Sequence, residues 1–117
     1  MTVFGYWRTS TTIQDGERQI IALKAAGAHQ IFGDKITGTS AYGERPELSS
    51  LLDALKPNDL LITEELSRLG RSMVEMLVQV NALIERGVEL KTLDNRLDTT
   101  TMPKEIVRLI VSVMGYA

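Results

Sequence analysis

Residues 3–10, VFGYWRTS, decide the fold of the chain and point to its site. The apolar start of this stretch predicts a strand over residues 3–7. Alternation along the strand puts Tyr6, Arg8 and Ser10 on one face at its end. A phenol, a permanent cation and a hydroxyl would therefore converge on one point. That arrangement suits an oxygen nucleophile attacking an anionic centre.

Strand and helix patterns alternate along the rest of the chain. The apolar spacing predicts helices over residues 15–26, from Pro46 through Leu55, from Ser72 to Gly87 and from Pro103 onward. Gly27 and Gly87 are expected to end the first and third of these helices, and Ser72 to cap the third. Strands are expected over residues 30–33, 60–63 and 88–93, with a loop over residues 34–44. This order predicts an α/β fold with a mainly parallel sheet of four to five strands, flanked by helices. The carboxyl ends of parallel strands share one edge, so Ser10, Asp34 and the 64–71 loop should meet there.

The composition narrows the chemistry. The chain has 117 residues, enough for one domain, with no cysteine, one histidine and a net charge of −2. We therefore expect no metal site and no serine–histidine pair. The chain lacks a signal peptide and a membrane span, which favours a cytoplasmic protein. Because DNA-binding domains are usually basic, any DNA affinity must come from a local arginine cluster or from a part outside this chain.

The last predicted helix carries apolar residues around well over half of its circumference. One side can pack on this domain, and the other side then needs a further surface, most simply a partner subunit. The ending, residues 112–117, SVMGYA, contains no polar helix stop before the last few residues. We expect the chain to be a fragment that ends within this helix.

Arginines surround the predicted nucleophile. Serine needs activation, and no histidine lies near Ser10 in the sequence. Arg8, Arg45, Arg68 and Arg71 could instead bind phosphate oxygens with paired donors and stabilise the charge of a phosphoryl-transfer transition state. Each also has a plainer interpretation: polar residues at a strand end, a solvated side chain before Pro46, or residues at a helix start. The functional interpretation gains weight because all of them are expected at the same sheet edge.

Several ordered motifs resemble the resolvase/invertase family of serine site-specific recombinases. They are GYWRTST at 5–11, Gln14 and Gln19, ALKAAG at 22–27, IFGDK at 31–35, Gly38, RPEL at 45–48, ELSRLGRS at 65–72 and DTTT at 98–101. The resemblance covers essentially the whole chain. It identifies residues 1–117 as a resolvase-type catalytic domain that ends within a long C-terminal helix, without the DNA-binding domain of the family.

The resemblance implies a mechanism. Ser10 would attack the scissile phosphodiester of double-stranded DNA and form a 5′-phosphoserine link, which releases a 3′-hydroxyl. The family reaction implies no metal and no cofactor, because the covalent link preserves the energy of the phosphodiester bond. Arg8, Arg68 and Arg71 would hold and activate the phosphate, with Arg45 assisting. The remaining site residues would be Tyr6, Gln14 and Gln19, which shape the pocket, and Asp34, which orients arginines. The last helix would build a homodimer, and two dimers would form a synaptic homotetramer.

This chain departs from the family pattern at two positions in the site region. Ser67 stands where the family usually has aspartate, so the charged partner that could orient arginines or take part in proton transfer is missing at this position. Trp7 replaces the small residue that commonly follows the tyrosine, which changes the packing beside the site.

Two alternatives remain open on the sequence alone. One is a small α/β regulatory module whose arginine edge binds a phosphate or nucleotide without catalysis. No Gly-x-Gly-x-x-Gly follows the first strand and no phosphate-loop Gly-Lys-Ser/Thr is present, which weakens nucleotide binding. The other is a structural oligomerisation domain, suggested by the apolar last helix.

Overall fold

In the computed structural model, β1 (Val3–Thr9) occupies an inner position in a parallel sheet of order β2-β1-β3-β4. The structure describes residues 1–9, 13–35, 46–70 and 72–116. The other elements are α1 (Ile13–Ala25), β2 (Gln30–Lys35), α2 (Pro46–Ala54), β3 (Leu60–Thr63), the 3-10 helix η1 (Leu66–Leu69), α3 (Met73–Glu85), β4 (Glu89–Thr92) and α4 (Lys104–Tyr116). Within the described residues, this confirms the predicted α/β fold with a parallel sheet.

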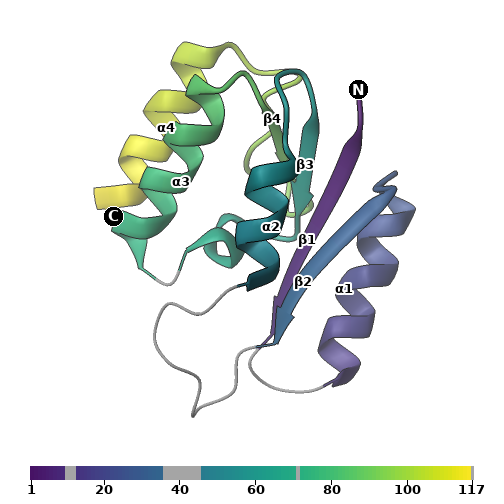
Figure 1. Cartoon of the computed structure of the whole chain (residues 1–117). Helices are drawn as coiled ribbons and strands as arrows, with labels where there is room; N and C mark the ends of the chain where they lie inside the picture. The colour runs from purple at the N-terminus through teal and green to yellow at the C-terminus, as the bar shows by residue number, and fades with distance from the viewer. Residues whose placement is uncertain (10–12, 36–45, 71, 117) are drawn as a thin grey trace.

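Helices cover both faces of the sheet, with α1 on one side and α2, α3 and α4 on the other (Figure 1). Alternation along β1 produces this division, because successive side chains point to opposite faces. Phe4 and Tyr6 join the core beneath α2 and α3, while Trp7 packs in the core beneath α1. Tyr6 and Arg8 therefore lie on the α2 and α3 side of the sheet.

Local signals set the helix ends as expected. Pro46 is the first residue of α2, and the Ser72 hydroxyl accepts a hydrogen bond from the Glu75 N–H at 3.1 Å, which caps α3. Gly27 and Gly87 follow α1 and α3 with φ of 104° and 79°, a conformation that favours glycine and ends a helix.

Other boundaries differ from the prediction. Helix α1 begins two residues earlier, at Ile13, and Pro103 precedes α4 rather than opening it. Strands β1 and β2 both run further, because their pairing continues through Arg8 opposite Asp34 and Thr9 opposite Lys35. Asp34 therefore belongs to a strand and not to a loop.

Helix α4 has both a buried and an exposed apolar side. Val107 is buried against the core and Ile110 packs partly against it. Ile106, Leu109 and Val113 remain exposed. The helix lies beside α3 (Figure 1), and the Arg108 guanidinium meets the Glu85 carboxylate at 2.7 Å. Across the described part of the chain, no helix combines the length and the apolar character needed to cross a membrane.

Candidate active site at the carboxyl ends of the strands

A buried tyrosine–aspartate pair joins β1, β2 and α2. The Tyr6 hydroxyl donates to Asp34 Oδ2 at 2.6 Å, and both side chains are buried. The Asp34 carboxylate also accepts from the backbone N–H groups of Glu47, at 3.1 Å, and Leu48, at 3.0 Å. These N–H groups lie in the first turn of α2, where they have no partner within the helix. Asp34 therefore caps α2 from the neighbouring strand.

Gln19 holds the backbone at the end of β1. Its side-chain oxygen accepts from the Arg8 N–H at 3.3 Å, and its Nε2 donates to the Arg8 carbonyl at 3.0 Å. The same Nε2 donates to Asp15 Oδ2 at 3.0 Å. Gln19 is only 1% exposed. It fixes the strand end next to Ser10 from the first half of α1.

The Arg8 guanidinium connects the end of β1 to the turn after β3. Its Nη2 donates to the Ser67 carbonyl at 2.8 Å and its Nη1 to the Gly70 carbonyl at 3.4 Å. Gly70 also lies close to the start of α3, where a Cβ would be only 2.4 Å from the Met76 nitrogen, so a larger residue there would push the turn away from α3. The predicted convergence is therefore observed for two segments that lie about sixty residues apart in sequence.

Arg68 lies in η1, beside the acidic residues that precede this helix. Glu64 Oε1 is 3.7 Å from Arg68 Nη2, and Glu65 Oε1 is 4.0 Å from Arg68 Nε. Among the described residues, the buried Arg68 Nε has no hydrogen-bond partner, and the buried Glu64 Oε2 is contacted by the Arg18 guanidinium in an ion pair. The Ser67 hydroxyl donates to the Glu65 carboxylate. Neither glutamate was among the predicted site residues, although the acidic doublet immediately before Leu66 is visible in the sequence.

Glu64 also binds Arg18 from α1. Arg18 Nη1 lies 3.0 Å from Glu64 Oε2, and Arg18 Nη2 lies 2.8 Å from Asp15 Oδ1. The hydrogen bond to Glu64 is the main cause that raises the pKa of Arg18. The hydrogen bond from Arg18 is the main cause that lowers the pKa of Asp15. An alternating row of charges, Asp15, Arg18, Glu64 and Arg68, thus links α1 to the turn after β3.

Comparison with known protein families identifies the family of this chain. The model of the resolvase N-terminal domain matches residues 3–116. The chain belongs to the resolvase family. It is 39% identical to the serine recombinase gin of Escherichia phage Mu. This alignment of 113 residues covers 97% of this chain and 56% of the recombinase. It is 40% identical to the DNA-invertase of Escherichia phage P1, and the alignment covers 97% of this chain and 58% of the invertase.

Another relative of this resolvase-family chain is the transposon Tn3 resolvase of Escherichia coli. It is 34% identical over 119 residues, which cover 100% of this chain and 63% of that protein. The chain thus spans 56% to 63% of the length of these relatives. The match and the relatives do not favour the regulatory-module alternative.

Two solved structures share the fold. The N-terminal catalytic domain of TP901-1 integrase aligns over 99% of this chain and 95% of its own, with a TM-score of 0.69 and 22% identity. A resolvase-family site-specific recombinase from Streptococcus pneumoniae aligns over 99% of this chain and 86% of its own, with a TM-score of 0.68 and 20% identity. At these identities the likeness supports the resolvase-type fold alone.

The structure describes some of the predicted site residues of this resolvase-family chain and not others. It brings together Arg8, Ser67 and Arg68, and places Tyr6, Gln19 and Asp34 around the same strand ends. The backbone of Gln14 lies in the first turn of α1. Ser10, Arg45 and Arg71 lie outside the described residues. In the described part, no cluster of histidine, aspartate or glutamate could hold a metal ion.

Trp7, the departure beside the site, packs against glycines. A Cβ added to Gly33 would lie 1.8 Å from the indole Cε2, and one added to Gly16 would lie 3.1 Å from the indole Cζ3. The indole therefore occupies space that side chains at these two positions would fill. A pocket of about 170 Å³ opens beside it, lined also by Thr9, Ile20 and residues nearby.

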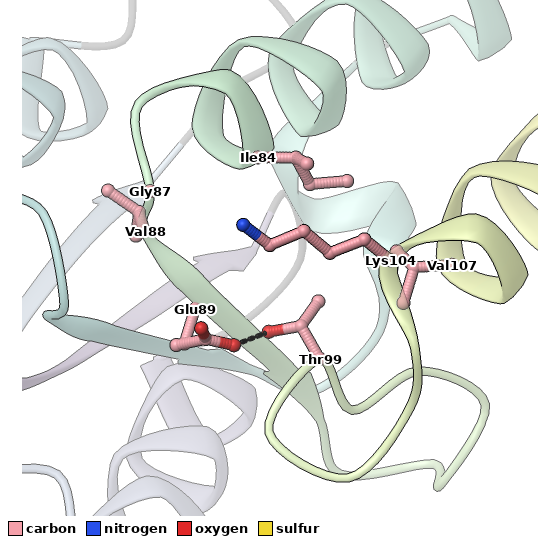
Figure 2. Close-up of a pocket in the computed structure, with 7 residues that line it drawn as sticks. All are labelled: Ile84, Gly87, Val88, Glu89, Thr99, Lys104 and Val107. Carbon is pink, nitrogen blue, oxygen red and sulfur yellow. Dashed lines mark hydrogen bonds between the residues drawn. The ribbon is translucent and has the colours of Figure 1, made fainter.

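A second pocket lies where β4 begins, away from the carboxyl ends of the strands. Figure 2 shows Lys104 extending across it toward Gly87 and Val88, and the Thr99 hydroxyl bonded to the Glu89 carboxylate. Its volume is about 10 Å³, room for at most about one water molecule. It is therefore no candidate for a substrate site.

Proposed function

We propose that this chain is the catalytic domain of a serine recombinase, which cuts and rejoins double-stranded DNA in site-specific recombination. The observation that carries the proposal is the junction of Arg8 with the Ser67 and Gly70 carbonyls, which brings the end of β1 to the turn that holds Arg68. Ser10 follows β1 by one residue. Membership in the family and the printed names of the relatives, a serine recombinase, a DNA-invertase and a resolvase, support the same function.

The chemistry is a phosphoryl transfer through a covalent intermediate. The Ser10 oxygen attacks the scissile phosphorus and loses its proton, while the bond from phosphorus to the 3′-oxygen breaks and that oxygen gains a proton. The product is a 5′-phosphoserine link and a free 3′-hydroxyl. Rejoining reverses these steps with a new 3′-hydroxyl. Because the serine ester preserves the phosphodiester bond energy, the reaction needs no high-energy cofactor.

Arginines would supply the electrostatic part of catalysis. Arg8, Arg68 and Arg71 would contact the phosphate oxygens, and Arg45 would assist. Guanidinium groups stay charged at any working pH and offer paired donors to phosphate. Arg68 fits this role, because it lies in η1, next to the Ser67 carbonyl that accepts from Arg8 at the end of β1.

The assembly follows from α4. We propose that its exposed apolar residues build a homodimer and that two dimers form a synaptic homotetramer on DNA. Ile106, Leu109 and Val113 recur at helical spacing on one exposed side, which suits a subunit contact. As a protein that acts on DNA, it would work in the cytoplasm.

A trapping experiment tests the proposed reaction. The protein is incubated with a pool of random-sequence duplexes that carry a nick, so that the cut strand diffuses away and cannot be rejoined. Covalent protein–DNA species are then isolated under denaturing conditions and sequenced. We expect Ser10→Ala to reduce the adduct by more than about a thousandfold, since the nucleophile is lost.

The matched control is Ser50→Ala, which removes an exposed hydroxyl from α2 and should leave the adduct unchanged. An adduct that survives in the Ser10→Ala protein, or one linked through another residue in the peptide map, would refute the assignment of the nucleophile.

A further inference from the structure

Arg68 lies near carboxylates without being bound tightly by them. Its Nη2 is 3.7 Å from Glu64 and its Nε is 4.0 Å from Glu65, both beyond good hydrogen-bond length. These contacts favour one orientation of the guanidinium through charge, and neither of them is a hydrogen bond. A side chain that binds a phosphate in the transition state needs a fixed orientation and N–H groups that are not already engaged in other hydrogen bonds.

Glu64 has the better support of the two glutamates. Its side chain is 23% exposed, against 45% for Glu65. Arg18 holds both Glu64 oxygens, at 3.0 Å and 3.2 Å, and Asp15 in turn holds Arg18 at 2.8 Å. Glu65 instead receives the Ser67 hydroxyl. An anchored carboxylate can orient its neighbour, whereas an exposed carboxylate in a loop contributes little.

The row of charges also reaches the other arginine of the site. Asp15 accepts from Gln19, and Gln19 holds the backbone N–H and carbonyl of Arg8. One continuous set of polar contacts therefore runs from the end of β1 to Arg68. The first half of α1 fixes both ends of this set relative to each other.

We propose that Glu64 is the positioning residue for Arg68, held in place by Arg18 and Asp15, and that it supplies the carboxylate that Ser67 cannot. The proposal rests on the proposed phosphate-binding role of Arg68. In this chain the acidic group acts from the end of β3, three positions before the serine. Glu64 does not itself touch the DNA and acts only through Arg68.

The first test measures the order of the Arg68 side chain and does not depend on activity. In isotope-labelled protein, the heteronuclear NOE of the Arg68 Nε–Hε group reports its motion. We expect Glu64→Gln to lower this NOE clearly, and the matched variant Glu65→Gln to leave it near the wild-type value. Arg18→Gln, which removes only the anchor of Glu64, should lower it by a smaller amount.

The second test measures adduct formation in a single turnover at saturating DNA. Glu64→Gln should slow the step on the order of tenfold because the arginine is misplaced, with little change in the DNA concentration needed for half-saturation. Ser67→Asp added to Glu64→Gln should restore much of the rate, because it returns a carboxylate to the same turn. Glu65→Gln should react at nearly the wild-type rate.

Two results would overturn the proposal. One is an Arg68 NOE that is unchanged in both Glu64→Gln and Arg18→Gln. The other is an equal effect of Glu64→Gln and Glu65→Gln, which would make the total charge of the turn responsible. If the wild-type protein forms no adduct at all, the proposed function fails, while the NOE comparison still decides whether Glu64 positions Arg68.

Discussion

At the scale of single residues, buried carboxylates in this protein hold backbone groups that are distant in sequence. Asp59 is an example outside the site. Its Oδ1 accepts from the Thr2 N–H at 3.0 Å and its Oδ2 from the Lys56 N–H at 2.9 Å. The side chain is 8% exposed. It ties the start of the chain to the turn that precedes β3, and so fixes the first residues of the central strand.

These bonds predict a pH dependence of stability. The N–H groups of Thr2 and Lys56 favour the charged form and lower the pKa of Asp59 below its ordinary value of 3.8. The stabilisation is therefore fully present above that value and is lost as the pH falls through the lower pKa of the folded state. Asp59→Asn presents an amide N–H₂ to one of the two N–H donors, so it should cost about 1–3 kcal/mol near neutral pH.

Urea unfolding of the wild type and Asp59→Asn, from about pH 7 down to about pH 2, measures this difference. We expect the gap in free energy of unfolding to narrow in acid. Asp53→Asn, at an exposed position on α2, is the control and should show almost no gap. A gap of the same size at every pH would contradict the ionic role of Asp59.

At the scale of the elements, α2 depends on a cap that belongs to another strand. Asp34→Ala would remove the carboxylate that accepts from the Tyr6 hydroxyl and from the N–H groups of Glu47 and Leu48, in a place that is largely buried. We expect a loss of about 3 kcal/mol in the free energy of unfolding. Tyr6→Phe removes only the hydroxyl bond and should cost about 1–2 kcal/mol.

Chemical denaturation of these two variants, alone and combined, measures their coupling. The double variant should cost less than the sum of the single ones, because both remove the same hydrogen bond. Strict additivity would show that Tyr6 and Asp34 act independently.

The same elements show what the sequence could predict. Pro46, Ser72, Gly27 and Gly87 were assigned correctly because a helix start or stop depends on the residue itself and its near neighbours. Parallel order then predicted that Arg8 and the turn carrying Arg68 meet. The cap by Asp34 depends on pairing between strands, which fixes where β2 ends, and that information is not local. The role of Arg18 in holding Glu64 likewise depends on contacts across the fold.

At the scale of the whole molecule, the two apolar sides of α4 differ, because one is buried in the domain and the other is exposed. The inner side packs into the core through Val107. The outer side contains Leu109, which is 60% exposed, together with Ile106 and Val113. Burying a leucine side chain is worth about 1.5–3 kcal/mol. In a dimer with two-fold symmetry, the same surface of both subunits forms the interface, so Ile106, Leu109 and Val113 would pack against their copies in the second subunit.

Leu109→Lys tests this outer side of α4. A lysine there would bring like charges together in the subunit contact and remove its apolar area, while the inner side of the helix stays as it is. We therefore expect the dissociation constant of the dimer to rise by at least about tenfold, with little change in the melting temperature of the domain. Sedimentation velocity over a range of concentrations measures the shift.

Ser112→Lys is the matched control. It adds the same charge on the polar strip of α4 that Glu105 and Arg108 share, so it should leave the assembly intact. A wild-type chain that sediments as a monomer at every concentration, or equal effects of the two lysines, would show that the outer side of α4 does not hold subunits together.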